Sequence, residues 1–482
     1  MYKKILFTFL CIGISLNIFA GKDTKAYEIK FKIKGLSNEK VLIAYRYADN
    51  QYIKDTLLLD ENGSVTWSGA NKLDRGVYMM VIPSMNNNYF EFLISDPQTF
   101  TLETDKSDLN RDMKVIGSKE NQVFFDDLLY MSKARLIADD YVAKSKSENK
   151  DTAAFYTKKL SELDKQVKAY RTNLISSNPN TLYAKILNAL QEHEPAEVPR
   201  NKDGSAVDTN FAYKDYLAHY WDNIDFSEEG LIRSPIYANK LETYFEKTLV
   251  QIPDTLIKGC DFVLKQARAN KEIFKYTLVT LLNKYASTKI MCMDAIYVHL
   301  VLNYYAKGDA PWVDSFTLIK MKMEANKKLP ILCDKIAPNL ILTDTTGVHA
   351  YSMYDIKSKY TIIVVWDPDC GHCKKEIPQL ANIYPQLKKL GATIYAVSTV
   401  SYEEIDKWKE FIRTNKCDFI NVADPYNQFA PGFRTLYDIS STPVIYVLDK
   451  DKRIIAKRIG VEQIEDFLIK YDEIVTKKAN KK

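Results

Sequence analysis

Two cysteines near the C-terminal end are the side chains best suited to chemistry. Cys370 and Cys373 flank Gly371 and His372 in a Cys-x-x-Cys motif. Such a motif between a buried strand and a helix is typical of a redox dithiol. The first cysteine then lies at the helix N-terminus, where free N–H groups and the helix dipole stabilise a thiolate. The second lies one turn further on the same face, so the spacing predicts thiol–disulfide exchange.

The elements that position this dithiol follow from the surrounding pattern. Residues 361–366 form a continuous apolar, largely β-branched run, as expected of a strand buried on both faces. A helix is predicted over 374–380. Further strands are predicted at 393–398, 419–422 and 444–448, with a hairpin partner at 453–459 and helices at 402–415 and 461–471. This β-α-β-α-β-β-α order is that of a thioredoxin fold.

Residues from about 335 to 470 resemble the TlpA/ResA-like thiol:disulfide oxidoreductases. The matching pieces are Ala337-Pro338, Leu342-Thr343-Asp344, Gly347, Trp366, the Cys370-to-Cys373 motif, Glu376, Pro378, Thr442-Pro443 and Gly460. The resemblance implies that Cys370 attacks, Cys373 resolves and Glu376 assists proton transfer. It also implies a cis proline, Pro443, facing the dithiol. No metal or organic cofactor is needed for this chemistry.

Two departures from the family pattern bear on how the dithiol is tuned. The residue before the first cysteine is usually Trp, and here it is Asp369, whose carboxylate is expected to raise the pKa of Cys370. His372 stands where the family often has Pro, and is expected to lower that pKa and make the disulfide more oxidising. Trp366 is a third candidate for tuning. The alternatives are that His372 is a solvated bystander and Glu376 a solvated helix residue.

Upstream of this region the hydrophobic period changes twice. From Tyr27 to about Lys114, short runs alternate apolar and polar residues between turns, which predicts an all-β sandwich or barrel. From about Lys119 to Lys328 the period is helical. We therefore predict a multidomain chain: an all-β sandwich over 27–115, an all-α domain over 116–330 and an α/β thioredoxin fold over 335–475. The β-domain carries no catalytic cluster, and we interpret it as a binding or docking module.

The first 20 residues are typical of a secretory signal peptide. Lys3 and Lys4 precede an apolar run from Ile5 to Leu16, and Ala20 offers a cleavage point. The run is shorter than the roughly 20 residues of a spanning helix. Cys11 is expected to be lost with this signal rather than to carry a lipid, because Leu10 precedes it. The mature chain is thus expected in the periplasm or cell envelope, an oxidising compartment.

The remaining cysteines and the histidines carry weaker signals. Cys260 and Cys292 lie in the helical zone and either pair across neighbouring helices or are two buried thiols. Cys333 and Cys417 lie outside any Cys-x-x-Cys context, and no catalytic role is predicted for them. Three isolated histidines are predicted to be satisfied core or surface residues rather than metal ligands: His193, His219 and His299.

Composition excludes several classes of protein. The 482 residues are 46% hydrophobic and 27% charged, which argues against wholesale disorder and against a polytopic membrane protein. A net charge of +5 over this length leaves no basic footprint for nucleic acid. The 32 tyrosines are attributed to sheet faces and helix packing rather than to a ligand site.

Together these features predict a periplasmic thiol:disulfide oxidoreductase of the reductase-leaning kind, acting in cell redox homeostasis on protein disulfides. The family resemblance implies a membrane electron donor. One alternative is a thiol peroxidase, which needs a Pro-x-x-x-Thr/Ser-x-x-Cys setting, whereas Pro368 lies only two residues before Cys370. The other alternative is an envelope binding or assembly protein whose thioredoxin-like module is a sensor or anchor.

Overall fold

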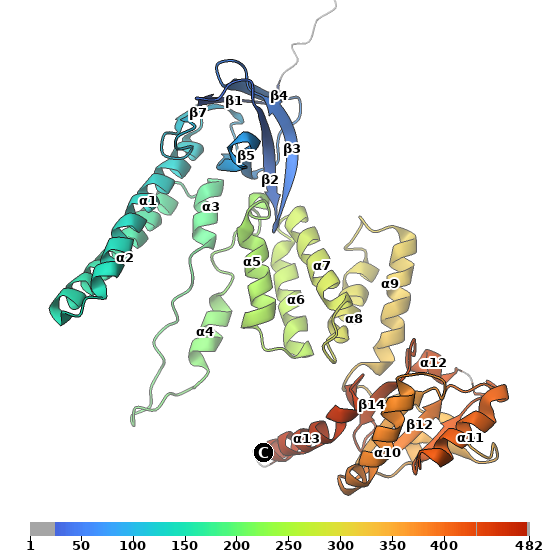
Figure 1. Ribbon diagram of the computed structural model, residues 1–482. Helices are drawn as coiled ribbons and strands as arrows, with labels where there is room; N and C mark the ends of the chain where they lie inside the picture. Colours follow the sequence, from blue (N-terminus) through green and yellow to red (C-terminus); the bar gives the residue numbers. More distant parts are fainter. Residues whose placement is uncertain (1–24, 430, 480–482) are drawn as a thin grey trace, which may run out of the picture. The chain divides into compact units, whose positions relative to one another are not determined.

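The computed structural model describes residues 25–429 and 431–479 (Figure 1). The predicted signal peptide, with Cys11, lies outside these residues. The chain divides into two compact units, with the boundary after Thr243. No helix in the described part of the chain has the length and apolar character needed to cross a membrane.

The first unit begins with two four-stranded sheets, ordered β4-β1-β7-β8 and β3-β2-β5-β6. The alternation predicted for β1 is present, because Ile29, Phe31 and Ile33 are buried between exposed lysines. Phe31 on the first sheet packs against Phe92 on the second, with ring centroids 5.4 Å apart, so the two sheets share one core. The strands are β1 (Tyr27–Lys34), β2 (Lys40–Tyr47), β3 (Asn50–Leu58), β4 (Ser64–Gly69), β5 (Gly76–Ile82), β6 (Asn88–Ile94), β7 (Thr99–Asp105) and β8 (Lys114–Ile116).

Helices complete the first unit. The helices α1 and α2 form an antiparallel hairpin, and the rings of Tyr130 and Tyr170 stack across it at 3.8 Å. Side chains of Ser118 and Asn149 cap these two helices by accepting from backbone N–H groups. Between α3 and α4 the chain runs through a long segment that is mostly irregular. The helices are α1 (Lys119–Ser145), α2 (Lys150–Ser177), α3 (Leu182–Ala189), α4 (Phe211–His219) and α5 (Pro235–Thr243).

The second unit opens with a helical region. Its apolar positions recur at helical spacing and are buried, as in α6, where Leu256, Val263 and Leu264 are fully buried. A π-helical turn, Tyr244–Thr248, precedes α6. The longer helices are α6 (Pro253–Ala267), α7 (Lys271–Ala286), α8 (Asp294–Asn303) and α9 (Ser315–Lys328).

Of the two alternatives for Cys260 and Cys292, the pairing is excluded, and the buried free thiol holds for Cys260 alone. Cys260 is a free, fully buried thiol on α6, whereas Cys292 forms a disulfide with Cys333, their Cα atoms 5.5 Å apart. Cys292 lies just before α8 and Cys333 just before the C-terminal domain, so the bridge ties the helical region to that domain. Because the two cysteines are 41 residues apart, the chain-entropy model gives a stabilisation of about 4 kcal/mol.

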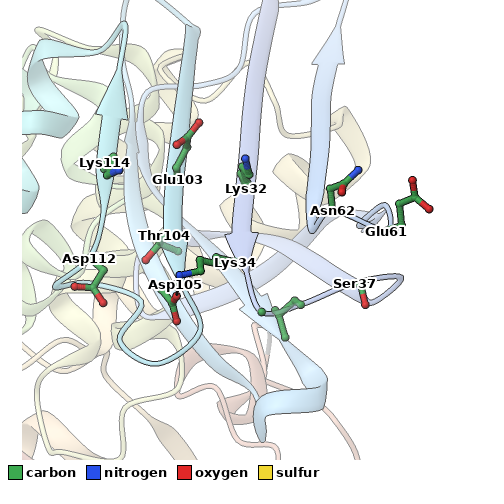
Figure 2. A pocket seen from close by; sticks show the side chains of 12 residues that line it. Lys32, Lys34, Ser37, Glu61, Asn62, Glu103, Thr104, Asp105, Asp112 and Lys114 are labelled. Carbon is green, nitrogen blue, oxygen red and sulfur yellow. Dashed lines mark ion pairs between the residues drawn. The ribbon is translucent and has the colours of Figure 1, made fainter.

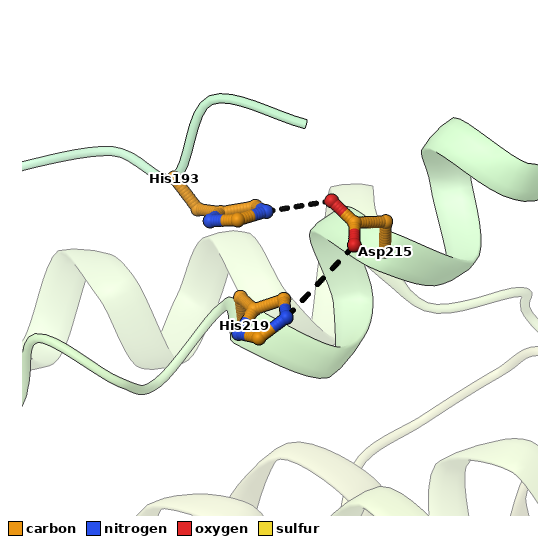
Figure 3. A group of neighbouring side chains, drawn as sticks. All are labelled: His193, Asp215 and His219. Carbon is orange, nitrogen blue, oxygen red and sulfur yellow. Dashed lines mark hydrogen bonds and ion pairs between the residues drawn. The ribbon is translucent and has the colours of Figure 1, made fainter. Parts of the chain in front are cut away.

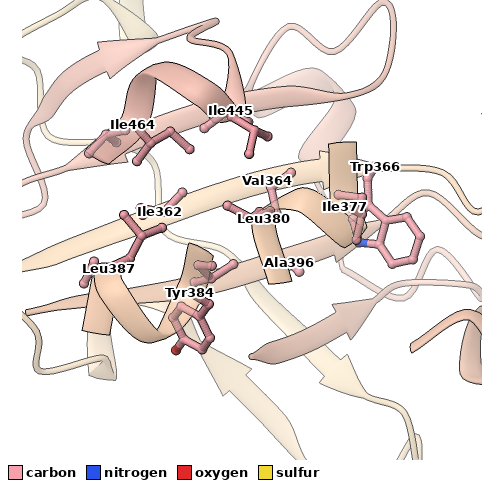
Figure 4. Packing of buried hydrophobic residues seen from close by; sticks show 14 of the residues in the cluster. Ile362, Val364, Trp366, Ile377, Leu380, Tyr384, Leu387, Ala396, Ile445 and Ile464 are labelled. Atoms are coloured by element: carbon pink, nitrogen blue, oxygen red, sulfur yellow. The ribbon is translucent and has the colours of Figure 1, made fainter. Parts of the chain in front are cut away.

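The C-terminal domain is a seven-stranded sheet ordered β10-β9-β13-β12-β11-β14-β15. An inner strand of this sheet, β11, pairs in parallel with β12 and antiparallel with β14, and every residue of β11 is buried. The two faces of the sheet carry separate apolar clusters, and α10 covers one of them through Ile377, Leu380 and Leu387 (Figure 4).

From β11 onwards the predicted order is present, with a short additional helix, α12, before β14. The prediction of a C-terminal thioredoxin-like domain after a helical region and N-terminal sheets is therefore confirmed. The strands are β9 (Ile341–Asp344), β10 (Ala350–Ser352), β11 (Tyr360–Trp366), β12 (Ala392–Ser398), β13 (Ile420–Ala423), β14 (Val444–Leu448) and β15 (Ile454–Lys457). The helices are α10 (Cys373–Lys389), α11 (Ile405–Thr414), α12 (Phe433–Leu436) and α13 (Ile464–Ala479).

Candidate active site

The turn between β11 and α10 presents both cysteines of the motif. Cys370 lies in the turn and is partly exposed, whereas Cys373 is the first residue of α10 and is fully buried. The carbonyl of Cys370 accepts a hydrogen bond from the N–H of Lys374 at 3.0 Å, so the helical hydrogen bonding starts at Cys370. The prediction that Cys370 lies at the helix N-terminus thus matches the geometry. Both thiols are free in the structure.

Cys370 is the thiol that favours its ionised form. Partial burial opposes ionisation, but hydrogen bonds from the backbone and side chain of Cys373 outweigh it and lower the pKa of Cys370. The N–H of Cys373 points at the Cys370 sulfur at 3.5 Å. A thiolate at this position is partly exposed and therefore accessible to a substrate disulfide.

Cys373 has the opposite character. Burial raises the pKa of Cys373 to about 12, so the thiol stays protonated near neutral pH. Its sulfur accepts a weak hydrogen bond from the N–H of Asp367 at 3.5 Å. An exposed thiol of lowered pKa beside a buried thiol of raised pKa is the arrangement that separates an attacking cysteine from a resolving one.

The loop before β14 lies against Cys370. The thiol of Cys370 donates to the carbonyl of Thr442 at 3.2 Å, and the Thr442–Pro443 peptide bond is cis, as the family resemblance implied. This contact brings Pro443 next to the dithiol, although 72 residues separate Thr442 from Cys370.

Asp369 is not the isolated carboxylate that the sequence suggested. Its side chain forms ion pairs with Lys407 of α11 and, at 3.5 Å, with Lys374 of α10. Lys407 holds the pKa of Asp369 below its ordinary value. Because two ammonium groups neutralise this carboxylate, its predicted effect of raising the pKa of Cys370 is offset.

The other tuning candidates occupy different surroundings. His372 is exposed at the start of α10, where its backbone carbonyl accepts from the N–H of Lys375 and of Glu376. Trp366 is fully buried at the end of β11 (Figure 4). Its ring packs against Phe411, with the ring centroids 5.0 Å apart. The tuning roles of Trp366 and His372 both stay predictions.

Glu376 lies one turn into α10, on the same face as Cys373, and is half-buried. Burial, followed by the nearby carboxylate of Glu462, raises the pKa of Glu376, and His372 opposes this shift. The carboxyl group therefore keeps its proton to a higher pH than an exposed glutamate, which suits it to passing a proton to or from the dithiol.

We expect Glu376→Gln to slow disulfide turnover near neutral pH severalfold and to change the pH profile of Cys370 alkylation, because the proposed proton transfer couples Glu376 to the dithiol. The measurement is the alkylation rate of the reduced chain between pH 5 and 9. The comparison variant is Glu462→Gln, which removes one cause of the raised pKa of Glu376, so that Glu376 ionises at a lower pH. Because Glu376→Gln instead keeps this position neutral, Glu462→Gln should shift the profile in the opposite direction and by a smaller amount.

Stability gives Glu376 an independent readout. A carboxyl group whose pKa is raised by folding favours the folded state at low pH and loses that contribution as the pH rises through the raised pKa. The free energy of unfolding of Glu376→Gln should therefore exceed that of the wild type at neutral pH and match it more closely in acid. Unchanged profiles in both measurements would mean that Glu376 is only a solvated helix residue.

Three residues near the site were missed by the sequence reasoning: Lys407, Thr442 as a hydrogen-bond acceptor, and Glu462. Lys407 belongs to a helix that was predicted, but its contact with Asp369 spans 38 residues and depends on how α11 docks on the sheet.

No catalytic role was predicted for Cys333 and Cys417, and their surroundings are consistent with that prediction. Cys417 is buried with its pKa raised to about 12, and Cys333 is in a disulfide.

The predicted isolation of the histidines is wrong for two of them. His193 and His219 stack at 4.3 Å, and both approach Asp215. His299 instead pairs with Asp261 at 2.7 Å and is satisfied, as predicted.

The N-terminal sheets carry an open pocket of about 760 Å³ (Figure 2). Side chains of both charges line it, among them Lys32, Glu103 and Lys114, and Lys34 pairs with Asp105 at 3.5 Å. This mixed lining matches no single class of ligand. The interpretation of the β-domain as a binding or docking module therefore stays a prediction.

Three family models match the chain. Residues 333–457 match the AhpC/TSA family, and residues 144–328 and 27–124 match two domains of unknown function, DUF5106 and DUF4369. The thiol-disulfide oxidoreductase ResA of Bacillus thuringiensis is 30% identical over 159 residues, which are 32% of this chain and 86% of that protein. ResA of Bacillus subtilis is 30% identical over 135 residues, 27% of this chain and 72% of that protein.

Solved structures resemble parts of the chain. A domain of a possible thiol-disulfide isomerase from Cytophaga hutchinsonii is 44% identical, with a TM-score of 0.28, over 30% of this chain and 97% of that one. A thioredoxin-like protein from Bacteroides caccae is 19% identical, with a TM-score of 0.42, over 58% of this chain and 99% of that one.

Proposed function

The chain belongs, through its C-terminal domain, to the family of ResA thiol-disulfide oxidoreductases, and on that premise we propose that it reduces protein disulfides in the periplasm or cell envelope through Cys370 and Cys373. The observation that carries the proposal is the asymmetry of the dithiol. Cys370 is partly exposed with a lowered pKa, and Cys373 is buried with a raised one. The contact of Cys370 with the Thr442 carbonyl supports a role for Pro443 in shaping the site.

The proposed cycle transfers two electrons and two protons. The Cys370 thiolate attacks one sulfur of a substrate disulfide, forms a mixed disulfide and releases the other substrate sulfur as a thiolate, which is then protonated. Cys373 loses its proton, with Glu376 as the proposed acceptor, and its sulfur attacks Cys370. The substrate leaves as a dithiol, and the chain keeps a Cys370–Cys373 disulfide. An external dithiol must reduce that disulfide, and the family resemblance favours a membrane electron donor.

The proposal includes the domain layout. The two sheets that share a core support a β-sandwich over 27–115, ahead of a helical domain over 116–330 and a thioredoxin-like domain over 335–475. The signal peptide over residues 1–20 belongs to the same proposal.

Peroxide reduction is disfavoured, because Asp367 stands three residues before Cys370 where a peroxidase has Thr or Ser.

Insulin reduction tests the proposal. In the presence of dithiothreitol, the purified chain without its predicted signal should precipitate the insulin B chain well before the uncatalysed reaction does. Cys370→Ser should return the rate to background, because the thiolate is the nucleophile. Cys417→Ser, which removes a buried thiol outside the motif, is the matched control and should keep wild-type activity. Equal rates for the wild type and Cys370→Ser would leave a binding protein with a sensor or anchor module as the better interpretation.

A further inference from the structure

Three potential metal ligands meet in the helical part of the first unit (Figure 3). His193 lies on the irregular segment between α3 and α4, whereas Asp215 and His219 lie one turn apart on α4 itself. His193 Nε2 is 2.6 Å from one carboxylate oxygen of Asp215, and His219 Nε2 is 3.9 Å from the other. One nitrogen from each ring and one oxygen of the carboxylate lie within 4.8 Å of one another.

Neighbouring groups orient these ligands. The Nδ1–H of His219 donates to Asp222 at 2.6 Å, since an ionised carboxylate can only accept. This leaves the Nε2 lone pair on the side of Asp215. A carboxylate that holds the far nitrogen of a ligand histidine is the usual support of a histidine that binds a metal. The N–H of Ala196 donates to Asp215 at 3.0 Å and fixes that carboxylate in turn.

We propose that His193, Asp215 and His219 bind one divalent transition-metal ion of the zinc class. Two imidazoles and a carboxylate suit Zn²⁺, whereas Ca²⁺ and Mg²⁺ require mostly oxygen ligands. With ligand bonds of about 2.0–2.2 Å, the ligand atoms of a tetrahedral ion lie about 3.4 Å apart. The three ligand atoms lie within 4.8 Å of one another, so each pair has to close by at most about 1.4 Å to reach this distance. The ion takes the place of the proton between His193 and Asp215. That proton moves to solvent or to Nδ1 of His193, and Nε2 is then free to donate its electron pair to the ion.

The site has three protein ligands and an open side. The side chain of His219 is 44% exposed, so a water molecule or a donor from a binding partner completes the coordination. An ion here would tie the segment between α3 and α4 to α4. Another histidine–carboxylate contact, His299 with Asp261, has no second histidine beside it among the described residues. That pair serves as the matched control.

Zinc titration of the metal-free chain tests the proposal. The dithiol is first oxidised, so that the thiolates of Cys370 and Cys373 cannot bind the ion. Calorimetry and metal analysis after gel filtration should give one Zn²⁺ per chain with micromolar or tighter affinity, and no uptake of Mg²⁺. His193→Ala and His219→Ala should each weaken binding at least 100-fold, and His299→Ala should leave it unchanged.

Asp222→Asn keeps all three ligands and should weaken binding 10- to 100-fold, the usual effect of losing a carboxylate that supports a ligand histidine. Folding of each variant is judged by circular dichroism of the metal-free protein. If an alanine variant is unfolded, the affinity of Asp222→Asn for Zn²⁺ tests the proposed site in its place. Zn²⁺ should also raise the melting temperature of the wild type, because it binds only the folded chain. Absence of zinc binding in the folded wild type, or binding that survives loss of both histidines, would overturn the proposal and leave an ion-pair cluster.

Discussion

Replacing Cys373 by Ser should convert transient mixed disulfides into stable ones. Cys370 keeps its place at the start of α10 and still attacks, but the thiol that would resolve the mixed disulfide is missing. In cells, covalent complexes between the variant and exported proteins should accumulate and should disappear on reduction. The measurement is non-reducing electrophoresis of the tagged chain, followed by mass spectrometry of the captured proteins.

The reciprocal variant is the control for this trapping. Cys370→Ser leaves only buried free thiols, among them Cys373, whose pKa is raised to about 12, so this variant should capture nothing. Complexes from Cys370→Ser, with none from Cys373→Ser, would reverse the two roles and refute the argument from the helix terminus.

The two thiols of the wild-type dithiol should also differ in their alkylation rates. The pKa of Cys373 is about 12, and that of Cys370 lies below the ordinary cysteine value. The thiolate fraction of Cys370 at pH 7 is then at least about 1,000-fold larger, because the ordinary cysteine pKa of 9.0 already lies three below that of Cys373. A thiolate of low pKa is intrinsically less nucleophilic, which takes back roughly 30-fold. We therefore expect Cys370 to react at least about 30 times faster.

Iodoacetamide labelling of the reduced wild-type chain, mapped by mass spectrometry, measures this ratio. The wild type is preferable to a variant, because Cys373 itself helps to lower the pKa of Cys370. Cys260 and Cys417 are internal controls, since both are buried and free and should stay unlabelled while the chain is folded. The Cys370 rate should level off at a pH below the ordinary cysteine pKa. Similar rates for Cys370 and Cys373 would contradict the proposed division of roles.

The dithiol could be predicted from sequence because its determinants are local. The apolar run of β11, the turn and the start of α10 follow one another within 20 residues, and each has its own signature: β-branched residues, Pro and Asp, then helical spacing. The raised pKa of Cys373 follows from the same pattern, because the inward face of α10 packs against the sheet.

The features that could not be predicted depend on contacts between distant parts of the chain. The lysine that neutralises Asp369 comes from α11, and the partner of Cys292 is 41 residues away. Cysteine spacing alone leaves several pairings open, and the bond of Cys292 to Cys333 excludes its pairing with Cys260. The proximity of His193 and His219 could not be predicted either, because it depends on the path of an irregular segment between α3 and α4.

Mapping the mixed disulfide tests the central claim most directly. Purified, reduced Cys373→Ser chain is mixed with a peptide that carries one disulfide, and the attachment site is located by mass spectrometry without reduction. We expect the peptide on Cys370 alone, with Cys260 and Cys417 unmodified and the Cys292–Cys333 disulfide intact. Attachment of the peptide to Cys260 or Cys417, or no attachment to Cys370, would contradict the assignment of Cys370 as the attacking residue.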